Sequence, residues 1–228
     1  MEHSSSIPAR MTTQIQTAGR RQDGSEGQRE IIAVAQKLFT TIGYRKTTVA
    51  DIAAELGMSP ANVYRFFDSK KSINEAVAEL LLDGIAAELD VIARSGTPPA
   101  ARLADFMRTL ARLSDERFMT NSRVNDMVED AMTESWNVCV RYAENVQAII
   151  ARIVEDGRAS GDFSIEDATV GASCVKATMT CFMHPTMMAL SAGHGRPGIE
   201  QVIDFALRGL GADPVKSTET VKTAGPAD

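Results

Sequence analysis

The sequence predicts an all-α protein made of a small N-terminal domain of three helices and a larger C-terminal helical domain. Two observations lead to this fold class. Apolar residues recur at three- and four-residue spacing along most of the chain, which is the period of an amphipathic helix, and no segment shows the strict alternation of a strand. Of the 228 residues, 44% are hydrophobic, which is enough for a substantial buried core.

The expected domain limits follow from composition. Residues 1–27 are rich in Ser, Thr, Gln and Gly, so we expect a disordered N-terminal arm. The three-helix domain is expected at 28–72 and the larger helical domain at 73–212. Residues 213–228 are polar and contain Pro214 and Pro226, so they are expected to form a flexible tail.

The first helix is expected from about Gln28 to Ile42, where Gly43 ends it. Its apolar stripe consists of Ile31, Ala35, Leu38, Phe39 and Ile42. Such a helix can brace the two shorter helices that follow.

A short helix, a glycine turn and a second short helix are expected between residues 48 and 67. Thr48 can cap the first, and Gly57 can end it in a left-handed conformation. Ser59 can cap the second, which has Pro60 at its first position and runs from Ala61 to about Phe67. This pattern is typical of a helix-turn-helix, whose second helix enters the major groove of DNA. An αα-hairpin in an ordinary helical core is the alternative.

The second short helix carries side chains suited to DNA. Its small N-terminal residues, 59–61, allow a close approach to base edges, and Asn62 can pair with adenine through a donor and an acceptor together. Tyr64, Arg65 and Lys70 can reach phosphates, which supply affinity more than sequence preference.

The segment GYRKTTVADIAAELGMSPANVYRFFDSKKSINEAV resembles the N-terminal domain of the tetracycline-repressor-like (TetR) family of bacterial regulators. The match includes Gly43-Tyr44, Thr47-Thr48-Val49, Gly57-Met58-Ser59 and Val63-Tyr64, within about residues 28–75. Pro60 departs from the family, which often has a lysine or another polar residue there that can contact a base or a phosphate. The candidate DNA-binding residues are Thr47, Thr48, Ser59, Pro60, Ala61, Asn62, Tyr64, Arg65 and Lys70.

The charge is unevenly distributed. Residues 1–75 contain ten Lys/Arg and eight Asp/Glu, whereas residues 76–228 contain fourteen and twenty-two. A mildly basic head on an acidic body fits a protein that contacts DNA at one end. Arg20 and Arg21 in the arm could enter a minor groove or remain solvated.

The sequence is expected to belong to a cytoplasmic protein. It has no apolar run of the ~18 residues that a membrane span needs, and no apolar core of a signal peptide. The three cysteines, Cys139, Cys174 and Cys181, are expected to be reduced and buried, with a redox-sensing role as the alternative.

The C-terminal domain is expected to contain only helices. A long helix over 70–94, interrupted only by Gly84, connects it to the head. The region 165–190 is nearly apolar on all sides, as in a helix that is buried on more than one side. The further helices are expected at residues 99–119, 122–132, 134–159, 165–190 and 196–210.

The last two of these helices are expected to form a homodimer interface, a pair from each protomer making a four-helix bundle. The family resemblance implies the same interface, and a two-fold dimer matches a palindromic double-stranded operator. The alternative is a monomer with a thick core.

The resemblance also implies an inducer cavity in the C-terminal domain. His184-Pro185 should interrupt its helix and free the carbonyl near Cys181, and His184 could contact either a ligand or the other protomer. Met-rich walls suit varied apolar ligands, and Trp and Tyr can stack on aromatic ones. The alternative is that these are core residues. The candidate lining residues are Phe106, Met107, Met127, Trp136, Cys139, Tyr142, Met179, Met183 and His184.

The leading hypothesis is a transcriptional regulator, usually a repressor in this family, that a small apolar or aromatic inducer releases from its operator. The alternative is a DNA-binding protein of the same fold whose partner is another protein or a nucleoid structure, without an inducer. An enzyme or carrier is the third class. No phosphate loop or nucleophile elbow is present, and His3, His184 and His194 are dispersed, so we expect no catalytic, metal or cofactor site.

Overall fold

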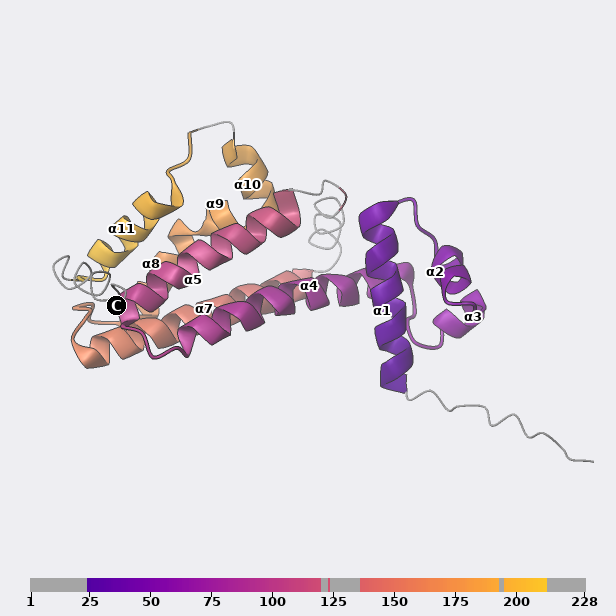
Figure 1. Cartoon of the computed structure of the whole chain (residues 1–228), viewed down its shortest axis with the longest axis horizontal. Helices are drawn as coiled ribbons and strands as arrows, with labels where there is room; N and C mark the ends of the chain where they lie inside the picture. The colour runs from indigo at the N-terminus through magenta and orange to yellow at the C-terminus, as the bar shows by residue number, and fades with distance from the viewer. Residues whose placement is uncertain (1–23, 120–122, 124–135, 193–194, 213–228) are drawn as a thin grey trace, which may run out of the picture.

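In the computed structural model, residues 24–119, 123, 136–192 and 195–212 are described, and their regular structure is entirely helical. Helices α1 (Gly24–Thr41), α2 (Val49–Glu55) and α3 (Pro60–Val63) form a small head at one end (Figure 1). Helix α4 (Lys70–Ala93) leaves the head and runs along the body, where it packs against α5 (Pro99–Ser114) and α7 (Trp136–Ser160). The predicted all-α fold with an N-terminal helix-turn-helix domain and a C-terminal helical domain is confirmed.

Helix α1 starts earlier than expected, at Gly24 instead of Gln28, so residues 24–27 belong to the helix and not to the predicted arm. Gly27 is buried, and a Cβ there would lie 2.7 Å from the ring of Phe66. The missing side chain therefore lets the first turn of α1 pack against the end of the helix-turn-helix. Farther along, Phe39 meets Tyr44 edge-to-face, with ring centroids 5.2 Å apart. The remainder of the predicted arm, 1–23, and the predicted tail, 213–228, lie outside the described residues.

Helix α4 connects the head and the body without a break. Ser69 caps it by accepting a hydrogen bond from the backbone N–H of Ser72 at 3.0 Å. Its buried face changes partner along its length, since α4 packs against α1 near its start and against α5 and α7 beyond. Gly84, which costs about 1 kcal/mol of helix propensity, lies under the guanidinium of Arg117; a Cβ at this position would be 3.3 Å from Arg117 Nη1.

The end of α5 differs from the expected helix over 99–119. The α-helix stops at Ser114, and Asp115–Met119 form a wider π-helical turn, η1. The helix predicted at 122–132 lies outside the described residues, apart from residue 123. Helix α7 ends at Ser160, and Gly161 follows with φ of 77°.

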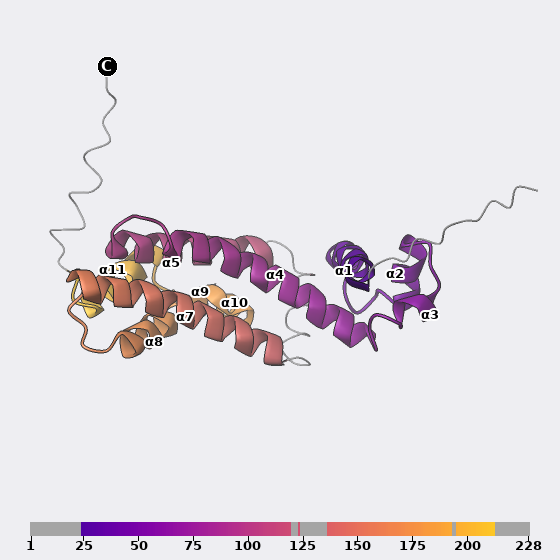
Figure 2. The same ribbon diagram turned by 90° about the horizontal axis from the view of Figure 1, so that it is seen from below.

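The single helix predicted over 165–190 is wrong. The chain forms α8 (Ala168–Thr178), α9 (Thr180–Met183) and α10 (Pro185–Ala192), as Figure 2 shows from below. His184 has an extended backbone with ψ of 114°, because a residue that precedes proline avoids the helical region. The carbonyl of Cys181 accepts a hydrogen bond from Arg196 Nη1 at 2.9 Å, just before α11 (Ile199–Gly209). The expected free carbonyl near Cys181 therefore has a partner from outside the helix.

No helix among the described residues is long and apolar enough to span a membrane.

Candidate nucleic-acid interface and ligand cavity

Two N-terminal caps, one for α2 and one for α3, and a glycine between the helices define the helix-turn-helix. The hydroxyl of Thr48 accepts from the N–H of Asp51 at 3.2 Å, and Asp51 Oδ2 accepts from the N–H of Thr48 at 2.7 Å. The Thr48 hydroxyl also donates to Asp51 Oδ2 at 2.7 Å, and this bond, together with the one from the Thr48 N–H, lowers the pKa of the Asp51 carboxyl. Gly57 has φ of 65°, which a residue with a side chain rarely adopts. Ser59 Oγ then accepts from the N–H of Asn62 at 3.3 Å and starts α3.

Helix α3 is shorter than the predicted Ala61–Phe67. Only Pro60–Val63 are α-helical. Tighter turns follow, in which an N–H bonds to the carbonyl three residues earlier, as Arg65 N–H does to Asn62 O at 3.2 Å. Val63, with no exposed surface, attaches α3 to the core of the head. Its neighbours Pro60, Ala61 and Tyr64 are exposed to solvent.

Most of the predicted DNA-binding residues lie on the surface of the head. Tyr64 is 51% exposed, Asn62 is half-buried, and Asn62 Nδ2 donates to Met58 Sδ at 3.6 Å. Lys70 is also half-buried, with its ammonium group 4.2 Å from the centre of the Tyr44 ring. The exposed members of the set are Thr48, Ser59, Pro60, Ala61, Tyr64 and Arg65.

Thr47 was expected in this set, but it is only 1% exposed, and its hydroxyl donates to the carbonyl of Gly43 at 2.9 Å. It therefore holds the turn before α2 and has no free group for DNA. Conversely, Arg45 and Lys46 are exposed beside the N-terminus of α2 and were not predicted. Two adjacent basic residues close before the cap at Thr48 were the signal in the sequence.

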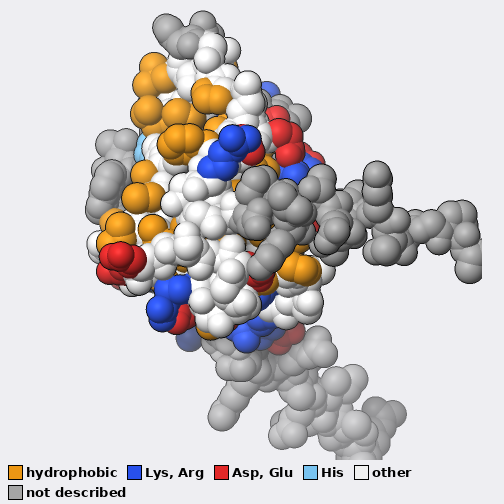
Figure 3. Space-filling view, turned by 90° about the vertical axis from the view of Figure 1, so that its left-hand side faces the viewer, with side chains coloured by type: hydrophobic (Ala, Val, Ile, Leu, Met, Phe, Trp, Pro, Cys, Tyr) orange, Lys and Arg blue, Asp and Glu red, His pale blue; other side chains and the backbone are white. Residues whose placement is uncertain are grey.

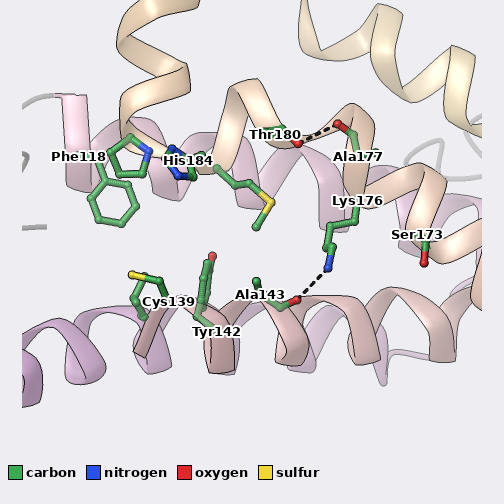
Figure 4. Close-up of a pocket in the computed structure, with 12 residues that line it drawn as sticks. Phe118, Cys139, Tyr142, Ala143, Ser173, Lys176, Ala177, Thr180 and His184 are labelled. Carbon is green, nitrogen blue, oxygen red and sulfur yellow. Dashed lines mark hydrogen bonds between the residues drawn. The ribbon is translucent and has the colours of Figure 1, made fainter. Parts of the chain in front are cut away.

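A cavity of about 250 Å³ lies in the body, between α7 and the α8–α10 segment (Figure 4). Helix α4 and η1 each contribute one residue to it. The lining residues are Leu82, Phe118, Cys139, Tyr142, Ala143, Ser173, Lys176, Ala177, Thr180, Met183, His184 and Pro185.

Four predicted pocket residues line this cavity: Cys139, Tyr142, Met183 and His184. Phe106, Met107 and Met179 have no exposed surface and belong to the core; they are not among the residues that line this cavity. Met127 and the side chain of Trp136 lie outside the described parts of the structure. Lys176 and Phe118 were not predicted, although a lysine in a nearly apolar segment was a usable signal.

Two polar atoms in the cavity wall are buried and have no hydrogen-bond partner among the described residues: Tyr142 Oη and His184 Nδ1. Burial raises the pKa of the Tyr142 hydroxyl, and the positive charge of Arg117 opposes this only weakly. Burial also raises the pKa of the Cys139 thiol. Buried polar atoms without partners are costly, so their position in a cavity wall indicates a place where a bound molecule can supply the missing hydrogen bonds.

The cavity is connected to α4 through η1. Phe118, 1% exposed, lines the cavity, and the adjacent Arg117 reaches across to α4. Arg117 Nη1 donates to the carbonyl of Leu81 at 2.9 Å, and Nη2 lies 2.8 Å from Glu88 Oε1. A change at the cavity wall can therefore reach the helix that leads to the head.

The C-terminal helices expose large apolar side chains. Val170 on α8 is 53% exposed, Leu190 on α10 is 59% exposed, and Phe205 on α11 is 67% exposed. Figure 3 shows hydrophobic side chains gathered along one side of the end of the body. We call Val170, Met187, Leu190 and Phe205 the C-terminal apolar residues. Such exposure is typical of an interaction surface.

No cluster of metal-ligating side chains occurs in the described part of the chain.

A helix-turn-helix head on a helical body is the architecture of a class of DNA-binding regulators. Residues 31–77 match the family model of bacterial regulatory proteins of the tetR family. Residues 99–201 match the family model of the tetracyclin repressor-like C-terminal domain. The chain belongs to the TetR family of transcriptional regulators, which bind operator DNA, act as dimers and are not enzymes.

Similar proteins include the HTH-type transcriptional repressor KstR2 of Rhodococcus jostii, 27% identical over 149 residues that make up 63% of this chain and 73% of KstR2. A transcriptional regulator from Cytophaga hutchinsonii has a similar fold, with a TM-score of 0.63, 20% identity and coverage of 82% of this chain and 99% of that one. The structure of RolR in complex with resorcinol aligns with a TM-score of 0.58, 20% identity and coverage of 90% and 97%.

Proposed function

We propose that this protein is a homodimeric repressor whose affinity for a palindromic operator falls when a small, largely apolar molecule occupies the cavity. The observation that carries the proposal is the cavity itself, whose wall includes two buried polar atoms without partners. It favours a small-molecule inducer over the alternative, control by a protein partner or a nucleoid structure alone. RolR with resorcinol supports a ligand site in this fold, and KstR2 supports the role of repressor.

The DNA contacts are assigned from exposure. Ser59, Pro60 and Ala61 are exposed at the N-terminus of α3, where the backbone can approach base edges. In this proposal Asn62 reads one base, whereas Tyr64, Arg65 and Lys46, which are exposed, contact phosphates. This division predicts sequence preference from one residue and general affinity from the others.

The dimer is assigned to the C-terminal apolar residues on α8, α10 and α11. Their exposure in a single protomer leaves apolar surface in water, and burying it favours association. In a two-fold dimer the two heads meet successive major grooves, about one helical turn of DNA apart.

Ligand binding acts through a difference in affinity between two states of the dimer. A ligand shifts the balance only if it binds one state more tightly than the other. Phe118 lines the cavity, and the adjacent Arg117 of η1 bonds to α4; both provide contacts that can differ between these states.

The experiment that tests this function is the selection of bound sequences from a random DNA pool at physiological salt. We expect a palindrome with two separated half-sites, and its recovery identifies the operator. Compounds that raise the melting temperature of the protein are then tested for release of that DNA. Sequence-blind binding contradicts the operator, and specific binding that no cavity ligand alters favours the protein-partner alternative.

A further inference from the structure

The cavity is electrostatically unbalanced. Lys176 is half-buried in its wall, and none of the described residues that line the cavity is acidic. Lys176 Nζ lies 3.5 Å from the carbonyl of Ala143, and no carboxylate among the described residues lies within ion-pair distance of it. A partly buried cation is stabilised by an opposite charge, which the described wall does not provide.

The position of Lys176 distinguishes it from the other polar groups of the cavity. Figure 4 shows Lys176 toward one end and His184 and Phe118 toward the other, with Tyr142 on the opposite wall across from His184. The hydroxyls of Ser173 and Thr180 donate to carbonyls earlier in the chain, Ser173 to Thr169 at 2.9 Å and Thr180 to Ala177 at 2.9 Å. The strongest free donor for a ligand is therefore the ammonium group at one end.

The size of the cavity limits the rest of the ligand. An apolar cavity of roughly 150 Å³ can hold benzene, so about 250 Å³ accommodates one ring, or an aliphatic group of similar size, with short substituents. Leu82, Phe118 and Met183 supply apolar contacts for such a body.

We propose that the cavity binds a small carboxylate, about one ring in size, whose carboxylate group accepts hydrogen bonds from Lys176. A hydroxyl or similar polar group at its far end pairs with Tyr142 Oη and His184 Nδ1. This inference rests on the proposed function, since it names the chemical class of the ligand of the same cavity. A charge-assisted hydrogen bond from a partly buried ammonium is stronger than one between neutral groups. The site therefore selects the acid over its neutral amide.

The test uses isothermal titration calorimetry on the full chain with benzoate, 4-hydroxybenzoate and cyclohexanecarboxylate, each compared with its primary amide. We expect the acids to bind about tenfold or more tightly than their amides. Lys176→Met should abolish this preference by weakening the acids alone, and Lys176→Arg should retain part of it. Lys71→Met is the matched control, because Lys71 is exposed and lies outside the cavity.

A second variant tests the far end. Tyr142→Phe should reduce the advantage of 4-hydroxybenzoate over benzoate and leave the affinity for benzoate unchanged. Circular dichroism melting curves establish that each variant is folded.

Any of three results overturns the inference. The acids and amides bind equally, Lys176→Met keeps the preference for acids, or neither series binds at millimolar concentration. The same protein is assayed for operator release. If only neutral compounds bind and release DNA, the proposed function holds and the carboxylate class is wrong. If the acids bind through Lys176 without altering DNA binding, the ligand class holds and the proposed control of the operator is wrong.

Discussion

At the scale of single residues, the buried hydroxyl of Tyr142 gives a test that needs no ligand. Its oxygen has no hydrogen-bond partner among the described residues, and leaving such a group unsatisfied costs about 1–3 kcal/mol. We therefore expect Tyr142→Phe to leave the free energy of unfolding unchanged or to raise it by up to ~1 kcal/mol. Urea denaturation measures this, with the exposed Tyr64→Phe as control. If Tyr142→Phe lowers the free energy of unfolding by more than ~1 kcal/mol, the hydroxyl has a stabilising partner and the prediction is wrong.

Asn62 provides a second residue-scale prediction. Asn62→Ala should lower operator affinity and relax the preference at one base pair of each half-site, at a cost of about 1–3 kcal/mol in discrimination. Arg65→Ala should instead weaken binding to all sequences similarly. Competition binding against single-base operator variants separates these effects. If Asn62→Ala alters neither affinity nor preference, α3 is not placed on the DNA as proposed.

At the scale of elements, local rules located the caps and the glycine turn of the helix-turn-helix. The caps at Thr48 and Ser59 and the left-handed Gly57 are present as expected. These features depend on hydrogen bonds within a few residues, which the sequence specifies directly.

Features that depend on tertiary packing were not predictable from the sequence in the same way. Pro185 signalled one break in the region 165–190, but the break at Met179 carries no proline or glycine. The π-helical turn at 115–119 has no local signal either, and it places Arg117 against α4 and Phe118 in the cavity. Phe106, Met107 and Met179 could not be distinguished from cavity-lining residues, because a buried Met179 and a cavity-lining Met183 have the same spacing and polarity.

Arg117 is the residue on which the connection between cavity and α4 depends. Arg117→Met should leave ligand affinity and operator affinity nearly unchanged when each is measured alone. It should reduce the factor by which ligand weakens operator binding, because the bonds to Leu81 and Glu88 are lost. Fluorescence anisotropy with and without ligand gives this factor. Arg112→Met, which removes an exposed pair with Glu116, is the control; an unchanged factor in Arg117→Met would exclude this route.

At the scale of the whole molecule, association is predicted to depend on the C-terminal apolar residues. Phe205→Asp should shift the protein toward monomer and weaken operator binding, since a charge at a buried interface is costly. Sedimentation velocity measures the association. Val91→Asp is the control, because Val91 is 72% exposed but lies on α4. If the Phe205→Asp variant remains a dimer, the interface does not include Phe205 and lies elsewhere on the protein.

The continuity of α4 has a mechanical consequence. Its 24 residues make a rod of about 36 Å, with the head at one end and the cavity farther along. By simple geometry a tilt of about 5° about its far end displaces the head by about 3 Å, and two-fold symmetry applies the same shift to the second head. The half-sites of an operator are fixed about 34 Å apart. Leu82, which lines the cavity, lies about 17 Å from the far end, so the same tilt moves it by about 1.4 Å. Under the proposed function, α4 therefore acts as a lever arm that roughly doubles a displacement at the cavity wall by the time it reaches the DNA.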